Sequence, residues 1–581
     1  MLRLVTRSRL TAAFSLLAVA FAVAMFALIF RGQRTGSLAT VAARHMIVAA
    51  SPYAAEAGRE MLRQGGSAVD AAIAAELVLT LVEPQSSGIG GGLYLLVSDA
   101  DGKMRAYDGR ETAPRSAFPS MFLESSGRPQ AFDDVARGGI AVGVPGTIAA
   151  LALAHRQYGR LPWRQLFKPA IALARSGYVV SPRLEKMIRS LNHDAISTDL
   201  QARYFHANGR PVRAGETLRN PLLAQTLQRI ADLGPRGFYD GPVAADIVNA
   251  ADHSRLNPAH MTLKDVRSYV ARERTPLCAS YRAYRVCSVP PSTSGGVSVL
   301  EILGLLKRFR SEQLQPNTLS TVHLITQASR LAYADRARWL GDPDFVAVPV
   351  EGLLNDKYLQ NRARLIDPGH DMGTAAAGVP LEKDARLRNF AAQPLPIDHG
   401  TSHLSVVDDS GEIVSMTMSI QDTFGAQIGA AGFVLNNELT DFSREPIVGG
   451  RAVANAPAPG KRPLSAMGPF IVFGPNGKFF AAVGTQGGQN IIAYDAQVLS
   501  ALIDGRLSMP DAVGLGHFVN TNGPTTVEIG TSLMLLWPRL ELMDHQVRFW
   551  TLPSGLNGIR RVPRGYEGGS DPRGEGVALG D

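Results

Sequence analysis

The feature that most constrains the fold is a threonine at the start of a strand-like run, two-thirds of the way along the chain. Gly400, Thr401 and Ser402 are small or hydroxylated, and residues 403–408 continue in the alternating pattern of a β-strand. A threonine hydroxyl is a poor nucleophile unless a base lies beside it. Cleavage of the chain before Thr401 would supply that base, because the freed α-amine takes the proton. The run therefore indicates a fold that presents Thr401 as a new N-terminus at the beginning of a strand.

Segments on both sides of Thr401 match a set of motifs in order. They are residues 65–72, 83–92, 108–114, 144–146, 237–241, 290–296 and 332–336 before it, and 435–443, 461–465 and 487–488 after it. In these segments the chain, from residue 49 to its end, resembles the γ-glutamyltransferases (γ-glutamyl transpeptidases). The members of that family are N-terminal-nucleophile hydrolases, made as one precursor that cleaves itself into two subunits.

The periodicity of the sequence predicts a mixture of helices and strands. Helices are expected at residues 54–64, 68–81, 321–340, 491–503 and 509–514, and mostly helical structure from 150 to 270. The helix at 321–340 is expected to be amphipathic. Two hairpins are expected, with strands at 402–408 and 412–419 and at 470–473 and 478–483, because turn residues separate the members of each pair. This pattern allows an α/β fold in which helices cover both faces of a pair of sheets. The resemblance sharpens the expectation to a four-layer αββα sandwich.

The resemblance also divides the chain into subunits. It implies a large subunit at residues 46–400, a small catalytic subunit at 401–581, and a heterodimer of these two cleavage products. Residues 366–400 are weakly periodic and contain Pro, Gly and Asp, which suits a surface segment that leads to the cleavage point.

The first 31 residues are typical of an export signal or a membrane anchor. Arg3, Arg7 and Arg9 precede an uncharged run at residues 11–30, which Arg31 closes. The run just reaches the roughly 20 residues that a membrane-spanning helix needs, and no clear small-x-small cleavage site follows it. An uncleaved inner-membrane anchor and a cleaved signal both fit, and either one exports the chain to the periplasm or another extracytoplasmic space. Residues 32–45 are predicted to be a linker.

Charge and motif content exclude several classes of function. The net charge is +8, but Lys and Arg are scattered and form no run with interleaved aromatic residues, so nucleic-acid binding is not expected. The glycine run at residues 88–92 matches neither a P-loop nor a dinucleotide-binding motif. No CxxC or HExxH motif is present, so a structural zinc site or a zincin-type protease has no support. None of the functions considered below calls for a metal or a cofactor. Cys278 and Cys287 either close a disulfide across a hairpin or remain two buried thiols.

The resemblance implies how Thr401 would act. Its hydroxyl first attacks the Gly400 carbonyl, which cuts the chain, and then attacks a γ-glutamyl carbonyl with its own α-amine as the base. Gly400 favours the first step, because a residue without a Cβ lets the hydroxyl approach the peptide. Ser419 lies where the family has a second hydroxyl beside the nucleophile. Gly487 and Gly488 would donate backbone N–H groups to the oxyanion.

Four further residues match the family's binding positions for the γ-glutamyl donor. Arg110 matches the arginine that pairs with the glutamyl α-carboxylate, where a planar guanidinium binds both oxygens. Glu438 and Asp441 match the carboxylates that hold the α-ammonium, and Ser465 matches a hydroxyl that binds the α-carboxylate. Such a set selects the free amino acid end of a molecule rather than a plain acyl group.

The sequence departs from the family at several points. Gln421 lies where the family usually has Asn, and Ala466 lies where it commonly has a second serine. The segment 442–461 lacks the aromatic gate of lid-bearing members, so water and larger acceptors would enter more easily. His403 is on the same strand face as Thr401, but we interpret it as structural because the family does not use it as the base.

Three functions compete. The first is a γ-glutamyltransferase that moves the γ-glutamyl group of glutathione to water, amino acids or dipeptides. The second is a glutaryl or cephalosporin-type acylase of the same family, which Glu438 and Asp441 argue against because a glutaryl group has no ammonium. The third is an inactive exported binding protein, which the intact Thr401 argues against.

Overall fold

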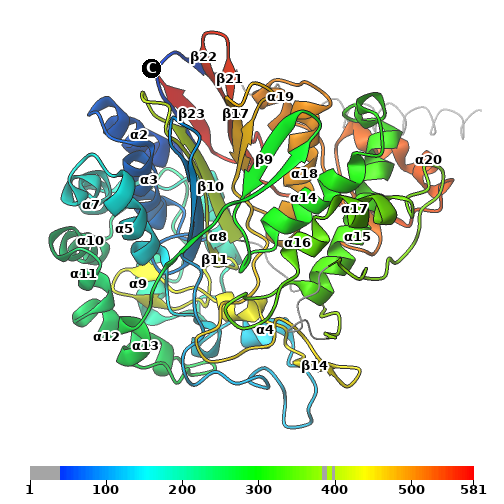
Figure 1. The fold of residues 1–581 in the computed structure, drawn as a ribbon. Helices are drawn as coiled ribbons and strands as arrows, with labels where there is room; N and C mark the ends of the chain where they lie inside the picture. The colour runs from blue at the N-terminus through cyan, green and yellow to red at the C-terminus, as the bar shows by residue number, and fades with distance from the viewer. Residues whose placement is uncertain (1–39, 382–388, 395–399) are drawn as a thin grey trace, which may run out of the picture.

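The computed structural model describes residues 40–381, 389–394 and 400–581 (Figure 1). Within these residues the chain forms a mixed α/β fold around two seven-stranded antiparallel sheets. One sheet has the order β23 (Val577–Gly580), β2 (Met46–Ala49), β10 (Gly400–Val407), β11 (Ile413–Gln421), β3 (Gly92–Ser98), β4 (Met104–Asp108) and β7 (Arg272–Arg274). The other has the order β1 (Thr40–Ala42), β22 (Gly565–Ser570), β21 (Asn557–Val562), β17 (Phe479–Gly484), β16 (Phe470–Phe473), β9 (Tyr284–Ser288) and β8 (Leu277–Tyr281).

The two sheets pack face to face, and helices cover their outer faces (Figure 1). On the β10 side lie α2 (Pro52–Arg63), α3 (Ala68–Val82) and α5 (Thr147–Tyr158). On the β17 side lie α14 (Gly295–Leu306), α15 (Leu319–Trp339), α18 (Ile491–Ile503) and α19 (Met509–Val513). Every residue of α3 is buried, because its small and apolar residues fit tightly between β10 and the surrounding helices. A Ser67–Asp70 capping box fixes where this helix begins.

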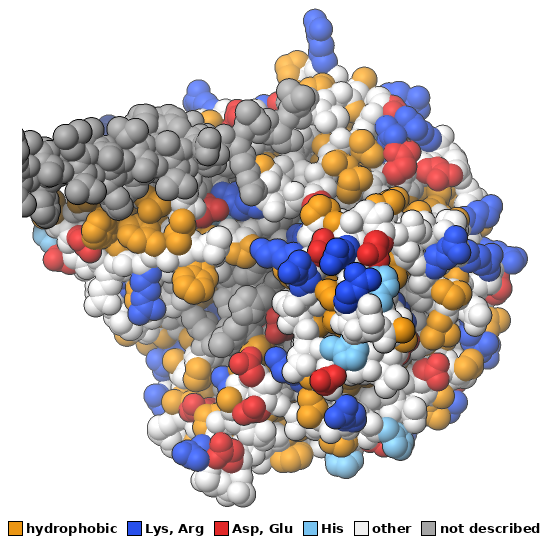
Figure 2. Space-filling view, turned by 180° about the vertical axis from the view of Figure 1, so that it is seen from behind, with side chains coloured by type: hydrophobic (Ala, Val, Ile, Leu, Met, Phe, Trp, Pro, Cys, Tyr) orange, Lys and Arg blue, Asp and Glu red, His pale blue; other side chains and the backbone are white. Residues whose placement is uncertain are grey.

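The remaining elements extend the fold at its sides. The stretch between β4 and β7 is mostly helical and includes α7 (Lys168–Ser176), α8 (Pro182–Ser190), α9 (Thr198–Tyr204), α10 (Pro221–Leu233) and α12 (Pro242–Asp252). A three-stranded sheet of β18 (Phe518–Val519), β19 (Thr525–Glu528) and β20 (Val547–Trp550) lies beside α20 (Trp537–Glu541). On the face shown in Figure 2, Lys and Arg side chains are interspersed with Asp and Glu.

Strands from before and after Thr401 share one sheet. β10 and β11 lie in its middle, and their neighbours on either side are β2 and β3 from the N-terminal part of the chain. Leu404 and Val406 of β10 face the helices, whereas His403 faces the other sheet at Gly484. The segments before and after residue 401 therefore share one core.

The structure resolves one open alternative and differs from two expectations. Cys278 and Cys287 form a disulfide between the paired strands β8 and β9, so they are not free thiols. The expected linker at 32–45 contains β1, which pairs with β22 at the edge of a sheet. The helix α15 is buried on all sides along residues 321–336 rather than amphipathic, because other elements cover both of its faces.

The expected signal or anchor at residues 1–31 lies outside the described residues. Among the described residues, no helix is both long enough and apolar enough to span a membrane.

Candidate active site

Thr401 lies at the buried start of β10, opposite a bulge in β11. Gly400 pairs with Gln421 and Ser402 pairs with Met418, so β11 carries one extra residue beside Thr401. The Thr401 hydroxyl donates to the Gly400 carbonyl at 2.5 Å, and the Ser419 hydroxyl donates to the same oxygen at 2.7 Å. Two hydroxyls therefore hold the carbonyl of the peptide bond that joins Gly400 to Thr401, and one of them belongs to Thr401 itself.

Gly400 has no room for a side chain. A Cβ at this position would lie 2.9 Å from the Gln421 carbonyl oxygen, so any other residue would push the strand start away from β11. The Ser419 hydroxyl also accepts the Gln421 backbone N–H at 2.8 Å, which fixes its orientation toward Gly400. Gln421 itself is buried with a positive φ of 80°, a strained conformation for a residue other than glycine.

The glycine pair expected at the oxyanion lies in the loop between β17 and α18. Gly487 and Gly488 have φ values of 138° and 56°, and a Cβ at Gly487 would lie 2.6 Å from a ring carbon of Tyr494. The loop begins directly after Gly484, which packs on the ring of His403 two residues beyond Thr401. The strand end that leads into this loop therefore packs on the face of β10 that points toward the other sheet.

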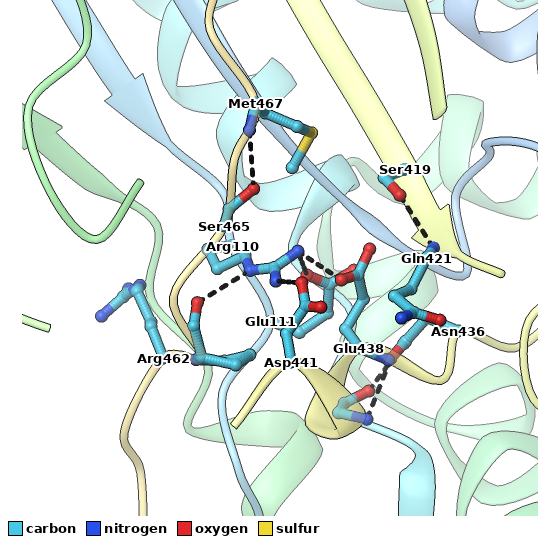
Figure 3. Close-up of polar contacts among 12 residues, drawn as sticks. Arg110, Glu111, Ser419, Gln421, Asn436, Glu438, Asp441, Arg462, Ser465 and Met467 are labelled. Atoms are coloured by element: carbon cyan, nitrogen blue, oxygen red, sulfur yellow. Dashed lines mark hydrogen bonds and ion pairs between the residues drawn. The ribbon is translucent and has the colours of Figure 1, made fainter. Parts of the chain in front are cut away.

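Arg110 is buried among carboxylates rather than open to a ligand (Figure 3). Its Nη1 donates to Glu438, its Nη2 donates to Asp441 at 2.5 Å, and its Nε donates to the Pro463 carbonyl at 3.1 Å. The family resemblance implied that Arg110 and the two acids bind opposite charges of one substrate. In the structure the two acids pair directly with the Arg110 guanidinium.

A third carboxyl adds to the excess of acidic groups in this cluster. Glu111 lies 3.6 Å from Arg110 Nη1, so one guanidinium faces three carboxyl groups. Burial raises the pKa of Glu438 to about 7, although Arg110 opposes that rise. Burial also raises the pKa of Glu111 well above its usual range and raises the pKa of Asp441. A buried site with excess acid is suited to a ligand that brings a cation.

Ser465 lies beside this cluster, on the segment that follows Arg462 (Figure 3). Its hydroxyl accepts the Met467 backbone N–H at 3.0 Å, and its carbonyl accepts the Ser294 hydroxyl at 2.5 Å. Ala466 is buried next to it. The segment 442–461 contains a small hairpin of β14 (Ile447–Val448) and β15 (Arg451–Ala452), whose tip is Gly449-Gly450.

Sequence reasoning missed two residues of the site, although both lie in motifs that it recognised. Glu111 follows Arg110 directly. The Asn436 side chain accepts the Glu438 backbone N–H at 3.1 Å and donates to the Gly90 and Gly143 carbonyls. It therefore holds the short 3₁₀ turn at Glu438–Asp441 against the rest of the fold. The available signal was the presence of a carboxyl and an amide side chain inside the matched motifs at 108–114 and 435–443.

His403 is buried, and its side-chain contacts are those of a structural residue. Its ring nitrogens contact the hydroxyls of Thr417 at 2.8 Å and Ser405 at 3.2 Å. Burial lowers the pKa of His403 to about 3, so the imidazole is neutral at physiological pH.

A family model described as Gamma-glutamyltranspeptidase matches residues 54–581. The chain belongs to the gamma-glutamyltranspeptidase family. Among curated proteins it is 34% identical to the "Glutathione hydrolase proenzyme" of Escherichia coli (strain K12), over 91% of this chain and 90% of that one. It is 37% identical to "Glutathione hydrolase 2" of Arabidopsis thaliana, over 82% and 80%. Among solved structures it is similar to the cephalosporin acylase from Bacillus halodurans, with a TM-score of 0.82 and 27% identity over 94% of this chain and 98% of that chain.

The match to the gamma-glutamyltranspeptidase family spans every part of the site described above. It includes β3 and β4, which lead to Arg110, and it also includes β10, β11 and the glycine loop. The family assignment therefore rests on nearly the whole chain and not on the Thr401 run alone.

Proposed function

We propose that this protein is a γ-glutamyltransferase that also works as a glutathione hydrolase. It would transfer the γ-glutamyl group of glutathione or a related compound to water, an amino acid or a dipeptide. The observation that carries this proposal is the buried cluster of Arg110 with Glu438 and Asp441, in a chain similar to proteins named glutathione hydrolase. Hydrolysis of γ-glutamyl-p-nitroanilide by the purified protein tests it, and a protein without that activity would refute it.

Self-cleavage would come first. The Thr401 hydroxyl attacks the Gly400 carbonyl carbon, the peptide C–N bond breaks, and the Gly400 acyl group moves to the Thr401 oxygen as an ester. Water then opens the ester to give a Gly400 carboxylate and a Thr401 α-amine. The proton of the Thr401 hydroxyl ends on the departing nitrogen, and the Ser419 hydroxyl supports the step because it donates to the Gly400 carbonyl oxygen and polarises the bond under attack. The word "proenzyme" in the name of the Escherichia coli relative also supports it.

The same hydroxyl would then attack the donor. The freed α-amine has an unperturbed pKa of about 7.7–8.0, so it takes the hydroxyl proton near neutral pH. The γ-glutamyl group becomes an ester on the Thr401 oxygen. The α-amine, protonated in the first step, then donates its proton to the departing amino group. Gly487 and Gly488 would donate N–H groups to the oxyanion, while Ser419 holds the nucleophile in place. Water or an acceptor amine then releases the glutamyl group.

Donor binding would proceed by exchange of ion pairs. The donor α-carboxylate would pair with part of the Arg110 guanidinium, and the donor α-ammonium would bind between Glu438 and Asp441. The total charge of the cluster does not change, because a zwitterion brings one charge of each sign. Ser465 and Gln421 would add hydrogen bonds at the edge of this site.

The acylase function is the second candidate, because the similar Bacillus halodurans structure is titled a cephalosporin acylase. A glutaryl group would leave Glu438 and Asp441 without a cation from the substrate, and a buried unpaired carboxylate is costly. We therefore favour γ-glutamyl over glutaryl substrates. Parallel rates on the γ-glutamyl and glutaryl anilides separate the two, and faster cleavage of the glutaryl compound would reverse the choice.

We infer three further features of the whole protein. The two facing sheets and their outer helices support a four-layer αββα sandwich. Cleavage before Thr401 would leave a large subunit ending at Gly400 and a small subunit of residues 401–581, held together because β10 and β11 lie between β2 and β3. Export is supported by the disulfide of Cys278 and Cys287, since disulfides persist in oxidising compartments. The apolar run at residues 11–30 would serve as the signal or the inner-membrane anchor.

A further inference from the structure

A second arginine, Arg183, contacts residues next to two segments of the candidate active site. Arg183 is the second residue of α8, whose start is fixed by two hydrogen bonds. The Ser181 hydroxyl accepts the Leu184 N–H at 3.1 Å, and a Glu575 carboxyl oxygen accepts the Arg183 N–H at 2.8 Å. The side chain therefore extends from a fixed point of the backbone.

The Arg183 guanidinium contacts two segments that lead to the active site. Its Nη2 donates to the Gln486 side-chain oxygen at 2.9 Å, and Gln486 directly precedes the glycine pair of the loop. The same nitrogen lies 3.4 Å from the Ser86 hydroxyl. The next residue, Ser87, donates to Ser402 at 3.1 Å, and Ser402 follows Thr401. Arg183 thus lies within a few contacts of both the nucleophile and the expected oxyanion site.

The charge around Arg183 differs from the charge around Arg110. Arg110 is 1% exposed and is bonded directly to two carboxylates. The Arg183 side chain is 22% exposed, and among the described residues the carboxylate that pairs with its guanidinium is Glu83, at 3.9 Å. Burial raises the pKa of Glu83, which weakens that acid as a counter-charge. The hydrogen bonds of the guanidinium to described residues all use Nη2 and end on neutral groups, so Nε and Nη1 face no charged partner there.

We propose that Arg183 binds the terminal carboxylate of the peptide portion of a γ-glutamyl peptide, on the leaving-group side of Thr401. This inference rests on the proposed γ-glutamyl function. A γ-glutamyl peptide such as glutathione has an amino acid zwitterion at one end and a peptide carboxylate at the other. The Arg110 cluster takes the first end, and the partly exposed guanidinium of Arg183 provides the cation for the second. A dipeptide acceptor would place its carboxylate on the same guanidinium during transfer.

The role makes Arg183 a specificity residue. It adds affinity for substrates with a charged carboxylate beyond the scissile bond, and it adds nothing for a substrate whose leaving group is neutral. A residue that only held Gln486 in position would affect all donors to the same extent.

The test compares glutathione with its glycyl ethyl ester, which lacks the terminal charge, by glutamate release. We expect wild-type kcat/KM to be about tenfold higher for glutathione, the size of one partly exposed charge-assisted hydrogen bond. In Arg183→Gln the ratio should fall to about one, and in Arg183→Lys it should stay between these values. The matched control is Arg189→Ala on the same helix, where the side chain is 67% exposed and pairs with Glu185. The control should keep the wild-type ratio.

Several results would overturn the inference. A wild type that cleaves the acid and the ester equally well refutes it without any variant, so a failure of Arg183→Gln to fold cannot rescue it. Equal losses on both substrates in Arg183→Gln would assign Arg183 to support of the Gln486 loop instead. A wild type that cleaves neither of these donors nor γ-glutamyl-p-nitroanilide would overturn the proposed function itself, and the Arg183 role with it.

Discussion

Replacing Arg110 by lysine tests the donor site most informatively. Arginine makes three hydrogen bonds here, to Glu438, Asp441 and the Pro463 carbonyl, and its planar fork reaches two carboxylates at once. Lysine keeps the positive charge but concentrates it on one nitrogen, so it cannot hold a substrate carboxylate in the paired geometry. Alanine would be a poorer choice, because it would leave buried carboxyls without a counter-charge, at a cost of about 3–5 kcal/mol in stability.

The expected effect of Arg110→Lys is the loss of one charge-assisted hydrogen bond to the donor. Such a bond contributes about 1.5–3 kcal/mol, which corresponds to an increase in KM of about 10- to 150-fold. The bond is made in the ground state and in the transition state alike, so kcat should change little. Self-cleavage should continue, because the Gly400 carbonyl is held by Thr401 and Ser419 rather than by Arg110.

Initial rates over a range of γ-glutamyl-p-nitroanilide concentrations give KM and kcat, and gel electrophoresis gives the extent of cleavage. Arg115→Lys is the matched control, since this side chain is exposed and lies 3.7 Å from Asp265, outside the cluster. An unchanged KM in Arg110→Lys would remove Arg110 from the donor site. A variant that no longer cleaves itself would refute the separation of the two functions.

Three other predictions follow from the same site and its strand. Since burial places the pKa of Glu438 at about 7 and the donor ammonium needs its ionised form, kcat/KM should fall below pH 7 more steeply than the roughly tenfold per pH unit that protonation of the Thr401 α-amine alone would give; a slope of only tenfold per unit down to pH 5 would contradict this. Ala466→Ser should lower KM for glutathione about 2- to 10-fold, and the wild type should hydrolyse more donor than it transfers to modest concentrations of a dipeptide; an unchanged KM or dominant transfer would count against it. His403 stays neutral in the fold with a pKa of about 3, so it stabilises the protein above pH 6.5 and this contribution is lost as the pH falls. Urea unfolding of the single-chain Thr401→Ala protein should therefore lose roughly 2–3 kcal/mol from His403 between pH 7 and pH 4.5, and His403→Gln should lack that loss. Equal acid sensitivity in both proteins would show that His403 does not contribute it.

Local patterns in the sequence predicted most of the secondary structure. The helix expected at 491–503 is α18, and the hairpin expected around Asp409-Ser410-Gly411 is β10 with β11. Both follow from signals a few residues long, namely continuous apolar character and a turn between alternating runs. The strand β1 has only three residues and therefore carries no such signal. Burial on all sides of α15 depends on which elements pack against it, and the sequence of the helix does not contain that information.

The site was predicted residue by residue but not as an arrangement. Arg110 and Glu438 are 328 positions apart, and their direct ion pair exists only because the fold brings β4 and the Glu438–Asp441 turn together. Arg183 lies in none of the motifs found in the sequence, so its place in the site was not predicted. Its position beside Gln486 depends on where α8 begins. The bulge that brings Ser419 to the Gly400 carbonyl also depends on the strand register, which a single sequence does not specify.

The most direct test of the account is the identity of the polypeptide chains in the purified protein. We predict two chains, one of which begins at Thr401 and has the mass of residues 401–581, as shown by N-terminal sequencing and intact mass spectrometry. Thr401→Ala should remain one chain and should not hydrolyse γ-glutamyl-p-nitroanilide. A fully active protein that remains uncut, or a small chain that begins at any other residue, would contradict the central claim that Thr401 becomes the nucleophile when the chain is cut before it.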